Sequence, residues 1–373
     1  MRITGKELVQ KFEAFAPSHL AEEGDPIGLA VGTLDKPVSK IMVTLDVRPE
    51  VVAEAIESGV DFIFAHHPPI FRPLKNLTSD IPQNKMFHDL IKHDITVYAA
   101  HTNLDITENG MNDWLAEAIG LSDTEVMTET TREYYKKLAV MVPAENAAEV
   151  RDALTAAGAG QIGTNYVDCS YTIKGTGRFT PIKGADPTIG DVNEAEEVTE
   201  LKVEVVVPNR LVKAVEHALI QAHPYEEPDY DLYTIENLYD SFGLGRVGNL
   251  AEPMTFIEFA QKMKETFQVD GLRYITGDEN QLIQRVAVCG GDGGKFYADA
   301  LKKQADVYIT GDVYYHVGHD MEADGLSVID PGHHIEQICK PKLVELFTEW
   351  KSELDWDVEI VSSSLNTDPF KFL

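Results

Sequence analysis

The sequence is poor in cysteine and in positive charge, and each shortage excludes a class of protein. Its 373 residues include only three cysteines, Cys169, Cys289 and Cys339, which are widely separated. Without a CxxC pair, thiolate zinc sites are excluded, and any metal would be held by nitrogen and oxygen atoms. Lysine and arginine number 32 against 62 aspartates and glutamates, a formal net charge of −30. Such a charge repels phosphate backbones and argues against DNA or RNA as a partner.

Long hydrophobic segments are also absent. No stretch approaches the roughly 18 uninterrupted apolar residues of a membrane helix, and residues 1–6 contain no apolar core of signal-peptide length. We therefore expect a cytoplasmic protein without a membrane partner. The hydrophobic fraction of 43% is sufficient for a buried core, and the length favours two domains or one domain with a large insertion.

Patterns of strand and helix alternate at both ends of the chain. In the N-terminal part we predict strands at 41–45, 62–65 and 95–100 and helices at 49–58 and 84–93. In the C-terminal part we predict strands at 284–289, 307–310 and 326–329 and helices at 295–304 and 313–323. This order predicts one α/β domain, with a mostly parallel sheet and helices on both faces, formed by residues 1–130 and 246–373.

An internal repeat occupies the middle of the chain. The segment 140–143 and the residues Val150, Leu154 and Ala157 match the segment 205–208 and the residues Val215, Leu219 and Ala222. Each copy has the pattern of a strand, a proline that opens a helix, and an apolar helical stripe. Together with strands near 170–179 and 229–235, the repeat predicts a ferredoxin-like α+β domain inserted at 131–245. We expect a polar linker at 127–132.

Residues that can bind metals follow several predicted strands. His66 and His67 end a hydrophobic strand, which the prolines at 68 and 69 prevent from continuing. Other strand ends carry His101, Asp105, Asp312, His333 and Glu336. Because ligands bind beyond the carboxyl ends of parallel strands, we expect these side chains to share one edge of the sheet. Imidazole and carboxylate groups without thiolate suit zinc, manganese or iron.

The adjacent histidines favour two metal ions over one. Successive side chains diverge from an extended backbone, so His66 and His67 do not easily reach the same ion. We predict that each binds a different ion and that Glu336 bridges the pair. The predicted ligands are His66, His67, Asp105, His333 and Glu336. His101 and His316 are predicted proton-transfer groups, because imidazole titrates near neutral pH.

Three other motifs carry less information. The segment 243–248 has the GxGxxG spelling but no clear preceding strand, and we expect a turn rather than a dinucleotide site. The glycine-rich loop 290–294 lies between a strand and a helix, where it could contact a substrate or form a simple tight turn. His223 stands beside a proline, and we expect a structural role for it.

The segments that carry these residues resemble a known family. They are Gly24–Leu29, Phe64–Pro68, His101–Asp105, Thr310–Asp312 and Gly332–Glu336. They resemble the dinuclear metal-centre family named GTP cyclohydrolase I type 2 homologues, which is Nif-three-like. The inserted module resembles the PII and copper-tolerance type of ferredoxin-like domain, most clearly at His223–Glu226.

The resemblance implies two divalent metal ions per subunit, zinc first with iron or manganese as alternatives, and a homohexamer. It implies that residues matching the five predicted ligands hold the ions. In some members the glutamate follows the histidine by four residues, whereas Glu336 follows His333 by three. His334 is therefore an alternative to His333 as the ligand.

Two functions are compatible with this sequence. The first is a metal-dependent hydrolase that acts on a nucleotide or a related small metabolite, with paired ions activating water. The second is a non-catalytic metal-binding or regulatory protein, whose inserted domain senses a ligand or organises the hexamer. A purely structural metal site is a third reading, but such sites are usually closed and four-coordinate. Five or more candidate ligands beside a glycine-rich loop favour an open site.

Overall fold

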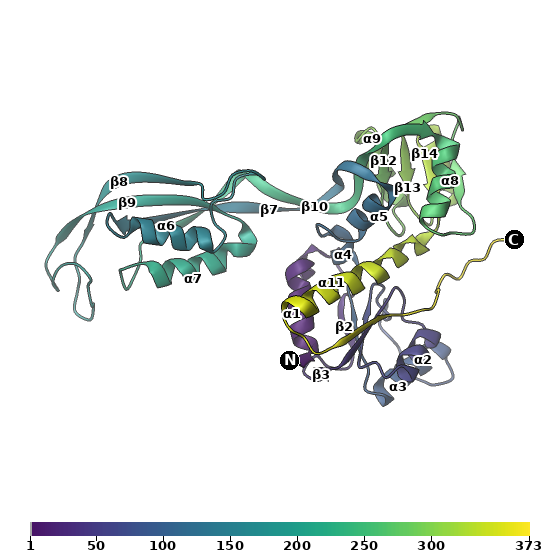
Figure 1. Cartoon of the computed structure of the whole chain (residues 1–373), viewed down its shortest axis with the longest axis horizontal. Helices are drawn as coiled ribbons and strands as arrows, with labels where there is room; N and C mark the ends of the chain where they lie inside the picture. Colours follow the sequence, from purple (N-terminus) through teal and green to yellow (C-terminus); the bar gives the residue numbers. More distant parts are fainter. Residues whose placement is uncertain (1) are drawn as a thin grey trace. The chain divides into compact units, whose positions relative to one another are not determined.

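The chain is divided into two compact units. The computed structural model describes residues 2–373. Unit 1 comprises Met1–Thr131 and Phe242–Leu373, and unit 2 comprises Arg132–Ser241 (Figure 1). Two long strands, β7 (Leu121–Pro143) and β10 (Tyr230–Thr255), belong partly to each unit. Among the described residues, none of the helices has the length and apolar character required to cross a membrane.

The first sheet of unit 1 has five strands. In spatial order they are β15 (Glu359–Ser362), β4 (Lys40–Thr44), β5 (Phe62–Ala65), β6 (Thr96–Ala99) and β2 (Gly28–Val31). Neighbours are parallel except β2, which pairs antiparallel with β6. All four residues of β5 are buried. A continuous hydrophobic run of this kind is typical of a parallel strand that is covered on both faces.

Helices cover both faces of this sheet. On one face lie α2 (Pro49–Glu57) and α3 (Pro82–Lys92), each of which begins with a proline in its first turn. On the other lie α1 (Gly5–Phe15) and α11 (Cys339–Glu353). There the ring of Phe64 from β5 lies 4.7 Å from Phe12 and 4.9 Å from Phe347, centroid to centroid, in edge-to-face contacts. Aromatic packing thus joins the first and last helices of the chain to the central strand.

A second sheet in unit 1 is built mainly by the C-terminal part, with β7 as the strand from earlier in the chain. Its strands are β11 (Arg273–Ile275), β14 (Ser327–Asp330), β13 (Val307–Ile309), β12 (Leu282–Val288), then β10 and β7. The strands β12, β13 and β14 are parallel, whereas β11 and β10 pair antiparallel with their neighbours. One face packs on α5 (Met111–Ile119) and α8 (Phe256–Thr266), and the other on α9 (Tyr297–Lys302) and α10 (Tyr315–Ala323).

Short elements complete this unit: β1 (Ile3–Thr4), β3 (Pro37–Val38), α4 (Thr102–Ile106) and the 3₁₀ segments η1 (Ser18–Leu20), η3 (Gly294–Phe296) and η4 (His333–Ile338).

The expectation of one mostly parallel sheet shared by both parts of the chain was wrong. Unit 1 is α/β, but its N-terminal and C-terminal parts build separate mixed sheets. The strand and helix patterns fix the order of elements along the chain, whereas the partner at each sheet edge depends on contacts distant in sequence. One hydrophobic core nevertheless includes residues from both sheets, among them Phe64 and Ile309.

Unit 2 has the element order β7, α6 (Ala147–Ala156), β8 (Ser170–Phe179), β9 (Glu196–Val207), a 3₁₀ turn η2 (Asn209–Leu211), α7 (Val212–Ala222) and β10. Its strands are arranged in the order β10, β7, β9, β8, and β9 pairs antiparallel with both β7 and β8. The helices α6 and α7 lie side by side on one face of the strands (Figure 1). The repeated apolar positions share one core, which contains Val150 and Leu154 from one copy and Val215 and Leu219 from the other.

Two local expectations were wrong for one reason. The polar segment 127–132 is part of β7 rather than a linker, and the glycine segment 243–248 is part of β10 rather than a turn. A Cβ atom on Gly243 would lie 2.0 Å from the carbonyl oxygen of Thr128, and one on Gly248 would lie 2.9 Å from that of Ser122. The glycines therefore permit close approach of β10 to β7.

Candidate metal centre

The paired histidines extend the end of β5. The backbone N–H of His66 donates to the carbonyl of Thr44 (3.1 Å), and that of His67 donates to the carbonyl of Leu45 (2.9 Å). Both residues are therefore anchored to the end of β4 and to the residue that follows it. Pro68 has no N–H to donate, so the pairing cannot continue. The two imidazoles consequently stand on a rigid strand end.

The ring of His66 is buried with one nitrogen unpaired. Its Nδ1 lies 2.8 Å from the carbonyl oxygen of Ala100, so Nδ1 carries the hydrogen and Nε2 is left with a free lone pair. Nε2 lies 3.5 Å from Oδ1 of Asp105, and neither atom has a hydrogen-bond partner. Two buried acceptor atoms that face one another are costly unless a cation or proton lies between them. Their chemistry and placement fit a divalent metal ion.

One carboxylate oxygen lies at the centre of the site. Oε2 of Glu336, a residue only 2% exposed, lies 3.0 Å from Nε2 of His67, 3.2 Å from Nε2 of His333 and 3.8 Å from Nε2 of His66. His333 and Glu336 both belong to η4, which follows β14. The site therefore joins the ends of strands from the two sheets of unit 1.

The glycine-rich loop leaves space for this carboxylate. Cβ atoms on Gly290 and Gly291 would lie 2.8 and 2.9 Å from Oε1 of Glu336. The N–H of Gly290 donates to Oδ1 of Asn112 (3.0 Å), and the side-chain amide of Asn112 donates to the carbonyl of Asp105 (2.9 Å). The loop therefore has a steric and positioning role beside the ligands, which is neither of the two roles expected for it.

Three overlapping groups of side chains could each hold a metal ion. They are His66, His67 and His101; His67, His333 and Glu336; and His66, Asp105 and Glu336. Within each group the potential ligand atoms lie within 4.8 Å of one another. The last two groups share Glu336 and together contain the five predicted ligands. His334, the alternative to His333, belongs to none of the three.

Of the two predicted proton-transfer groups, the structure brings only one to the ligand cluster. His101 joins the cluster, with its ring centroid 5.3 Å from that of His66. His316 does not, because it is exposed on α10 and its ring packs 5.4 Å from that of Tyr315. The proton-transfer role expected for His316 was therefore wrong, because its side chain does not join the ligand cluster. Helical periodicity directs this side chain to the outer surface, which the sequence position after a strand does not reveal.

Each of three histidines has a carboxylate behind it. The carboxylates of Asp46, Asp312 and Asp25 lie 2.7, 2.7 and 2.9 Å from Nδ1 of His67, His333 and His101, respectively. Such carboxylates orient the imidazole and leave Nε2 available as a ligand. Sequence reasoning missed Asp46, although its position directly after the β4 strand was an available signal. It placed Asp25 only by resemblance.

The carboxylates favour positive charge in the cluster. Burial acts to lower the pKa of His67, but the hydrogen bonds with Asp46 and Glu336 outweigh it and raise the pKa to about 9. Burial also acts to lower the pKa of His333, but the hydrogen bonds with Asp312 and Glu336 outweigh it and raise the pKa to about 11. Burial raises the pKa of Asp105. Because histidine ligands bind metals in the neutral form, a metal ion must displace these protons.

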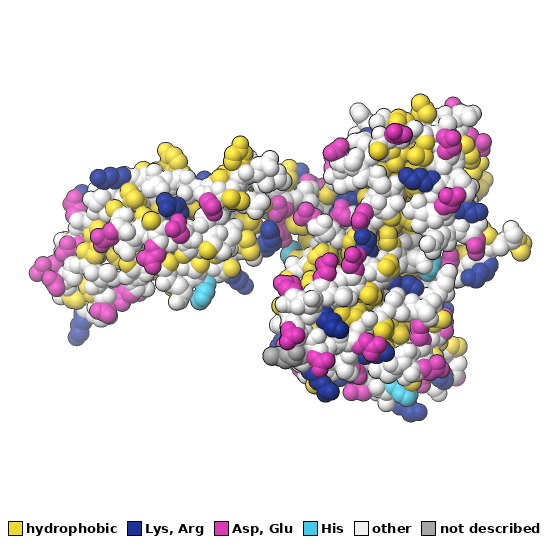
Figure 2. Space-filling view, in the orientation of Figure 1, with side chains coloured by type: hydrophobic (Ala, Val, Ile, Leu, Met, Phe, Trp, Pro, Cys, Tyr) yellow, Lys and Arg dark blue, Asp and Glu magenta, His cyan; other side chains and the backbone are white. Residues whose placement is uncertain are grey.

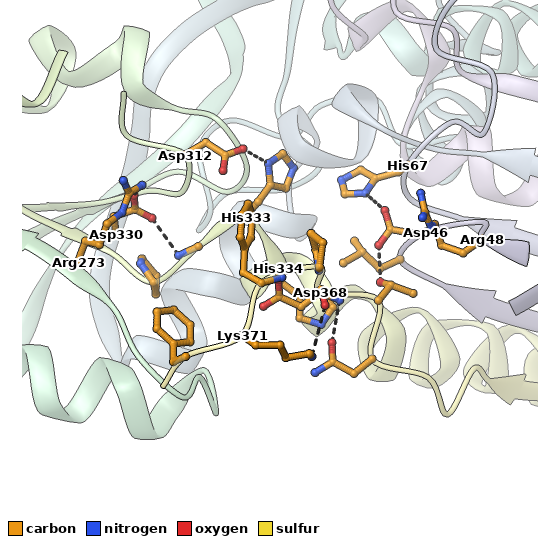
Figure 3. Close-up of a pocket in the computed structure, with 18 of the residues that line it drawn as sticks. Asp46, Arg48, His67, Arg273, Asp312, Asp330, His333, His334, Asp368 and Lys371 are labelled. Carbon is orange, nitrogen blue, oxygen red and sulfur yellow. Dashed lines mark hydrogen bonds and ion pairs between the residues drawn. The ribbon is translucent and has the colours of Figure 1, made fainter. Parts of the chain in front are cut away.

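The cluster opens into a cavity of about 810 Å³ (Figure 3). Figure 3 shows His67 beside Asp46 on one wall and His333 beside Asp312 on the opposite wall. Residues 366–372 of the C-terminal segment also line the cavity. The basic residues of the lining are Arg48, Arg273 and Lys371. A small molecule can therefore approach the candidate ligands from solvent.

Comparison with known proteins gives a single consistent result. The family described as Duf34/NIF3 (NGG1p interacting factor 3) matches residues 3–369. A Bacillus subtilis protein named GTP cyclohydrolase 1 type 2 homolog is 48% identical over 371 residues, covering 100% of this chain and 99% of that protein. A Listeria monocytogenes protein of the same name is 48% identical over 368 residues, covering 99% of this chain and 98% of that protein.

Solved structures agree over the full length. The crystal structure of a Bacillus cereus protein related to NIF3 has a TM-score of 0.94 and 44% identity, and covers 100% of both chains. A Staphylococcus aureus protein has a TM-score of 0.78 and 30% identity, covering 100% of this chain and 99% of that one. The similarity thus includes both units and both sheets.

Proposed function

The chain belongs to the Duf34/NIF3 family, and on that premise we propose that it binds two divalent metal ions per subunit and hydrolyses a nucleotide or a related small metabolite. One observation carries this proposal. Glu336 lies in two ligand groups at once, one with His67 and His333 and the other with His66 and Asp105. In these two groups the adjacent histidines would bind different ions, although His66 and His67 also meet in a third group with His101.

The ligand atoms define the class of metal. Nitrogen and oxygen donors without thiolate suit zinc, with iron and manganese as alternatives. Two such ions, when bound, lower the pKa of water and stabilise developing negative charge. Protein groups supply the remaining requirements, which are orientation of the ligands, an accessible cavity and a proton acceptor.

His101 is the proposed proton-transfer group. Asp25 holds its Nδ1, which leaves Nε2 facing the cluster. Burial acts to lower the pKa of His101, but the hydrogen bond to Asp25 and the nearby charge of Asp105 outweigh it and raise the pKa. A ring held in this way can take a proton from water at Nε2 and return it to a leaving group.

The cavity supports an anionic substrate. Arg48 and Arg273 line it, with side chains that are 54% and 67% exposed. The lining also contains five acidic residues, Asp46, Glu50, Asp312, Asp330 and Asp368, of which Glu50 pairs with Arg48 and Asp330 with Arg273, so the anionic substrate would rely on bound metal ions as well as on these side chains. Lys371 adds a third positive charge to the lining. Guanidinium groups bind phosphate well because their donors match the geometry of phosphate oxygens. This chemistry favours a nucleotide or another phosphorylated metabolite over a neutral one.

We further propose that unit 2 is an inserted ferredoxin-like domain of the PII type and that the protein assembles as a hexamer. The first proposal is supported by two strand-helix-strand halves and by the strand order β10, β7, β9, β8. The second rests on family resemblance. With a chain mass of 41.4 kDa, light scattering distinguishes a hexamer from a monomer or dimer directly.

A second candidate function is regulatory. In this alternative the metal centre does not turn over a substrate, and unit 2 senses a ligand. The observation that favours it is a separate cavity in unit 2, lined by aromatic and acidic side chains.

Metal content and turnover together test the proposal. We expect about two metal ions per chain in the native protein and fewer than one in Glu336→Gln, because both ligand groups lose a charged oxygen. Glu322→Gln, an exposed change on α10, is the matched control and should keep both ions. A native content of one ion or none would overturn the dinuclear centre.

A screen of nucleotides and phosphorylated metabolites then tests hydrolysis. Turnover by the native protein that disappears in His67→Ala supports the hydrolase. Two bound ions without turnover of any compound would instead support the regulatory alternative.

A further inference from the structure

Unit 2 contains a small cavity that lies outside the metal centre. It has a volume of about 250 Å³, smaller than most sites for drug-sized ligands. Its walls come from the end of β8, the connection that follows it, the strand β9 and the segment between α7 and β10. None of the candidate metal ligands lines it, so an inference from this cavity does not depend on the proposed hydrolase.

A buried acidic side chain forms part of the wall. Glu200 is only 7% exposed, and its Oε1 accepts a hydrogen bond from the hydroxyl of Tyr225 (3.1 Å). Its Oε2 lies over Gly177, where a Cβ atom would approach to 2.0 Å. The absence of a side chain at residue 177 therefore makes room for the carboxyl group beside the cavity.

No basic side chain among residues 2–373 forms an ion pair with Glu200. The nearby imidazole of His223 does not supply a charge either. Its Nε2 lies 2.9 Å from the carbonyl oxygen of Met141, and its Nδ1 accepts from the N–H of Tyr225 (3.1 Å). A ring that accepts at Nδ1 is neutral, and burial lowers the pKa of His223 in agreement. A buried carboxylate without a countercharge is unfavourable, so a cation in the cavity would stabilise Glu200.

The rest of the lining favours a cation as well. Phe179 and Tyr225 contribute aromatic rings, 5.9 Å apart and in an edge-to-face arrangement. The lining contains three more acidic residues, Glu226, Glu227 and Asp229. Its one basic residue, Arg178, lies 3.1 Å from the carboxylate of Glu197. Figure 2 shows Asp and Glu side chains spread over the visible face of this unit.

The arrangement distinguishes an organic cation from a metal ion. Among the described residues, three groups have ligand atoms that converge as a metal ion requires, and all three lie in unit 1. The acidic side chains around this cavity do not converge in that way. A carboxylate beside aromatic rings instead matches the requirements of an ammonium group, whose charge is attracted to the faces of the rings.

We propose that the cavity of unit 2 binds a small organic ammonium ion, with Glu200 as its countercharge and Phe179 and Tyr225 as its aromatic walls. The acidic residues at the rim attract the cation, and the aromatic rings contact its alkyl groups. This site gives unit 2 a ligand of its own, distinct from the substrate of the metal centre.

Two ammonium probes and a neutral isostere test the proposal. Choline and ethanolammonium are titrated into the full-length protein, and binding is followed by calorimetry and by saturation-transfer NMR of the probe. The neutral compound 3,3-dimethyl-1-butanol has the shape of choline without its charge. We expect at least one ammonium probe to bind and the neutral isostere to bind at least about tenfold more weakly, the factor that corresponds to ~1.4 kcal/mol. Equal binding of choline and its isostere, or binding of neither ammonium probe, would overturn the proposal.

Variants locate the binding. Glu200→Gln keeps the shape of the side chain and should weaken ammonium binding by at least about tenfold. Phe179→Leu keeps apolar volume but removes a ring, and should weaken it by several-fold. Glu204→Gln is the matched control on the same strand, because Glu204 pairs with Lys202 at 2.9 Å and does not line the cavity. Unchanged binding in both test variants, or replacement of the probe by Mg²⁺ or Ca²⁺ at this site, would refute the assignment.

Discussion

Two histidines that precede prolines, the half-buried His67 in unit 1 and the buried His223 in unit 2, have opposite surroundings. The ring nitrogens of His67 face two carboxylates, those of Asp46 and Glu336. Those of His223 face only backbone groups. Carboxylates favour a positive charge, whether a proton or a metal ion, whereas a backbone carbonyl and N–H fix a neutral ring.

The partners of a histidine, rather than its own sequence context, therefore determine its chemistry. Both residues follow a regular element and both are adjacent to proline. His223 is even followed closely by acidic residues, but its ring nitrogens do not bond to them. The expected structural role of His223 agrees with these contacts.

The largest expected difference between the two histidines is in metal content. His67→Gln should lower metal affinity by more than about 100-fold, because it removes a proposed direct ligand, whereas loss of an outer-shell partner typically costs 10–100-fold. His223→Gln should leave metal content unchanged and should instead destabilise unit 2 by about 1–3 kcal/mol, because it disturbs buried hydrogen bonds. Elemental analysis and thermal unfolding of both variants measure the two effects. Equal metal content in the two variants would show that His67 contributes no more to metal binding than His223 does.

The second difference is in the pH dependence of stability after removal of metal by a chelator. The folded-state pKa of His67 is raised to about 9, so its contribution is fully present below pH 6.5 and is lost as the pH rises through 9. A shift of this size corresponds to about 3 kcal/mol. The pKa of His223 is lowered, so its contribution is present above pH 6.5 and is lost on acidification.

Thermal unfolding of the chelated protein between pH 5 and pH 10 measures whether the stability falls at alkaline pH, as expected from His67, and at acidic pH, as expected from His223. His67→Gln should flatten the alkaline decline, and His223→Gln should flatten the acidic one. An alkaline decline of native size in His67→Gln would show that other groups produce it.

Much of the local structure was predictable from the sequence. Hydrophobic strands such as 62–65 and prolines at helix starts encode their structure within a few residues. The family resemblance was also confirmed, because its motifs are short and specific. The turn expected at 243–248 was wrong. The glycines there are explained by the close approach of a neighbouring strand, β7, which is more than 100 residues distant in the sequence.

The same distinction applies to the site. His66, His67 and Glu336 were selected correctly as neighbours because ligand-type residues after strand ends are visible in the sequence. Asp46 was missed because its role depends on the ring of His67, which it meets only in the folded chain. The proton-transfer role predicted for His316 was wrong because a helix turns its side chain to solvent. Contacts with distant partners therefore separate what the sequence reveals from what it does not.

Replacing Asp46 should make the surroundings of His67 more like those of His223. Asp46→Asn replaces the carboxylate behind the ring with a neutral amide, which should lower metal affinity by 10–100-fold while the fold is retained. The pKa of His67 should fall with it, because one of its two charged partners is lost. Competition with a metal chelator measures the affinity, and NMR titration of the imidazole measures the pKa. Asp35→Asn, an exposed change in unit 1, is the control. Native metal affinity in Asp46→Asn would show that Glu336 alone orients His67.

The smallest expected effect tests whether the C-terminal segment reaches the metal centre through Asp46. The hydroxyl of Thr367 donates to Oδ2 of Asp46, whose other oxygen holds His67. Thr367→Val removes one hydrogen bond, which is worth about 1 kcal/mol, and should lower metal affinity by about fivefold. The control is Thr348→Val, because the hydroxyl of Thr348 bonds only within α11. If both variants bind metal equally, the C-terminal segment lines the cavity without orienting the ligand, and the contrast between His67 and His223 depends on carboxylates alone.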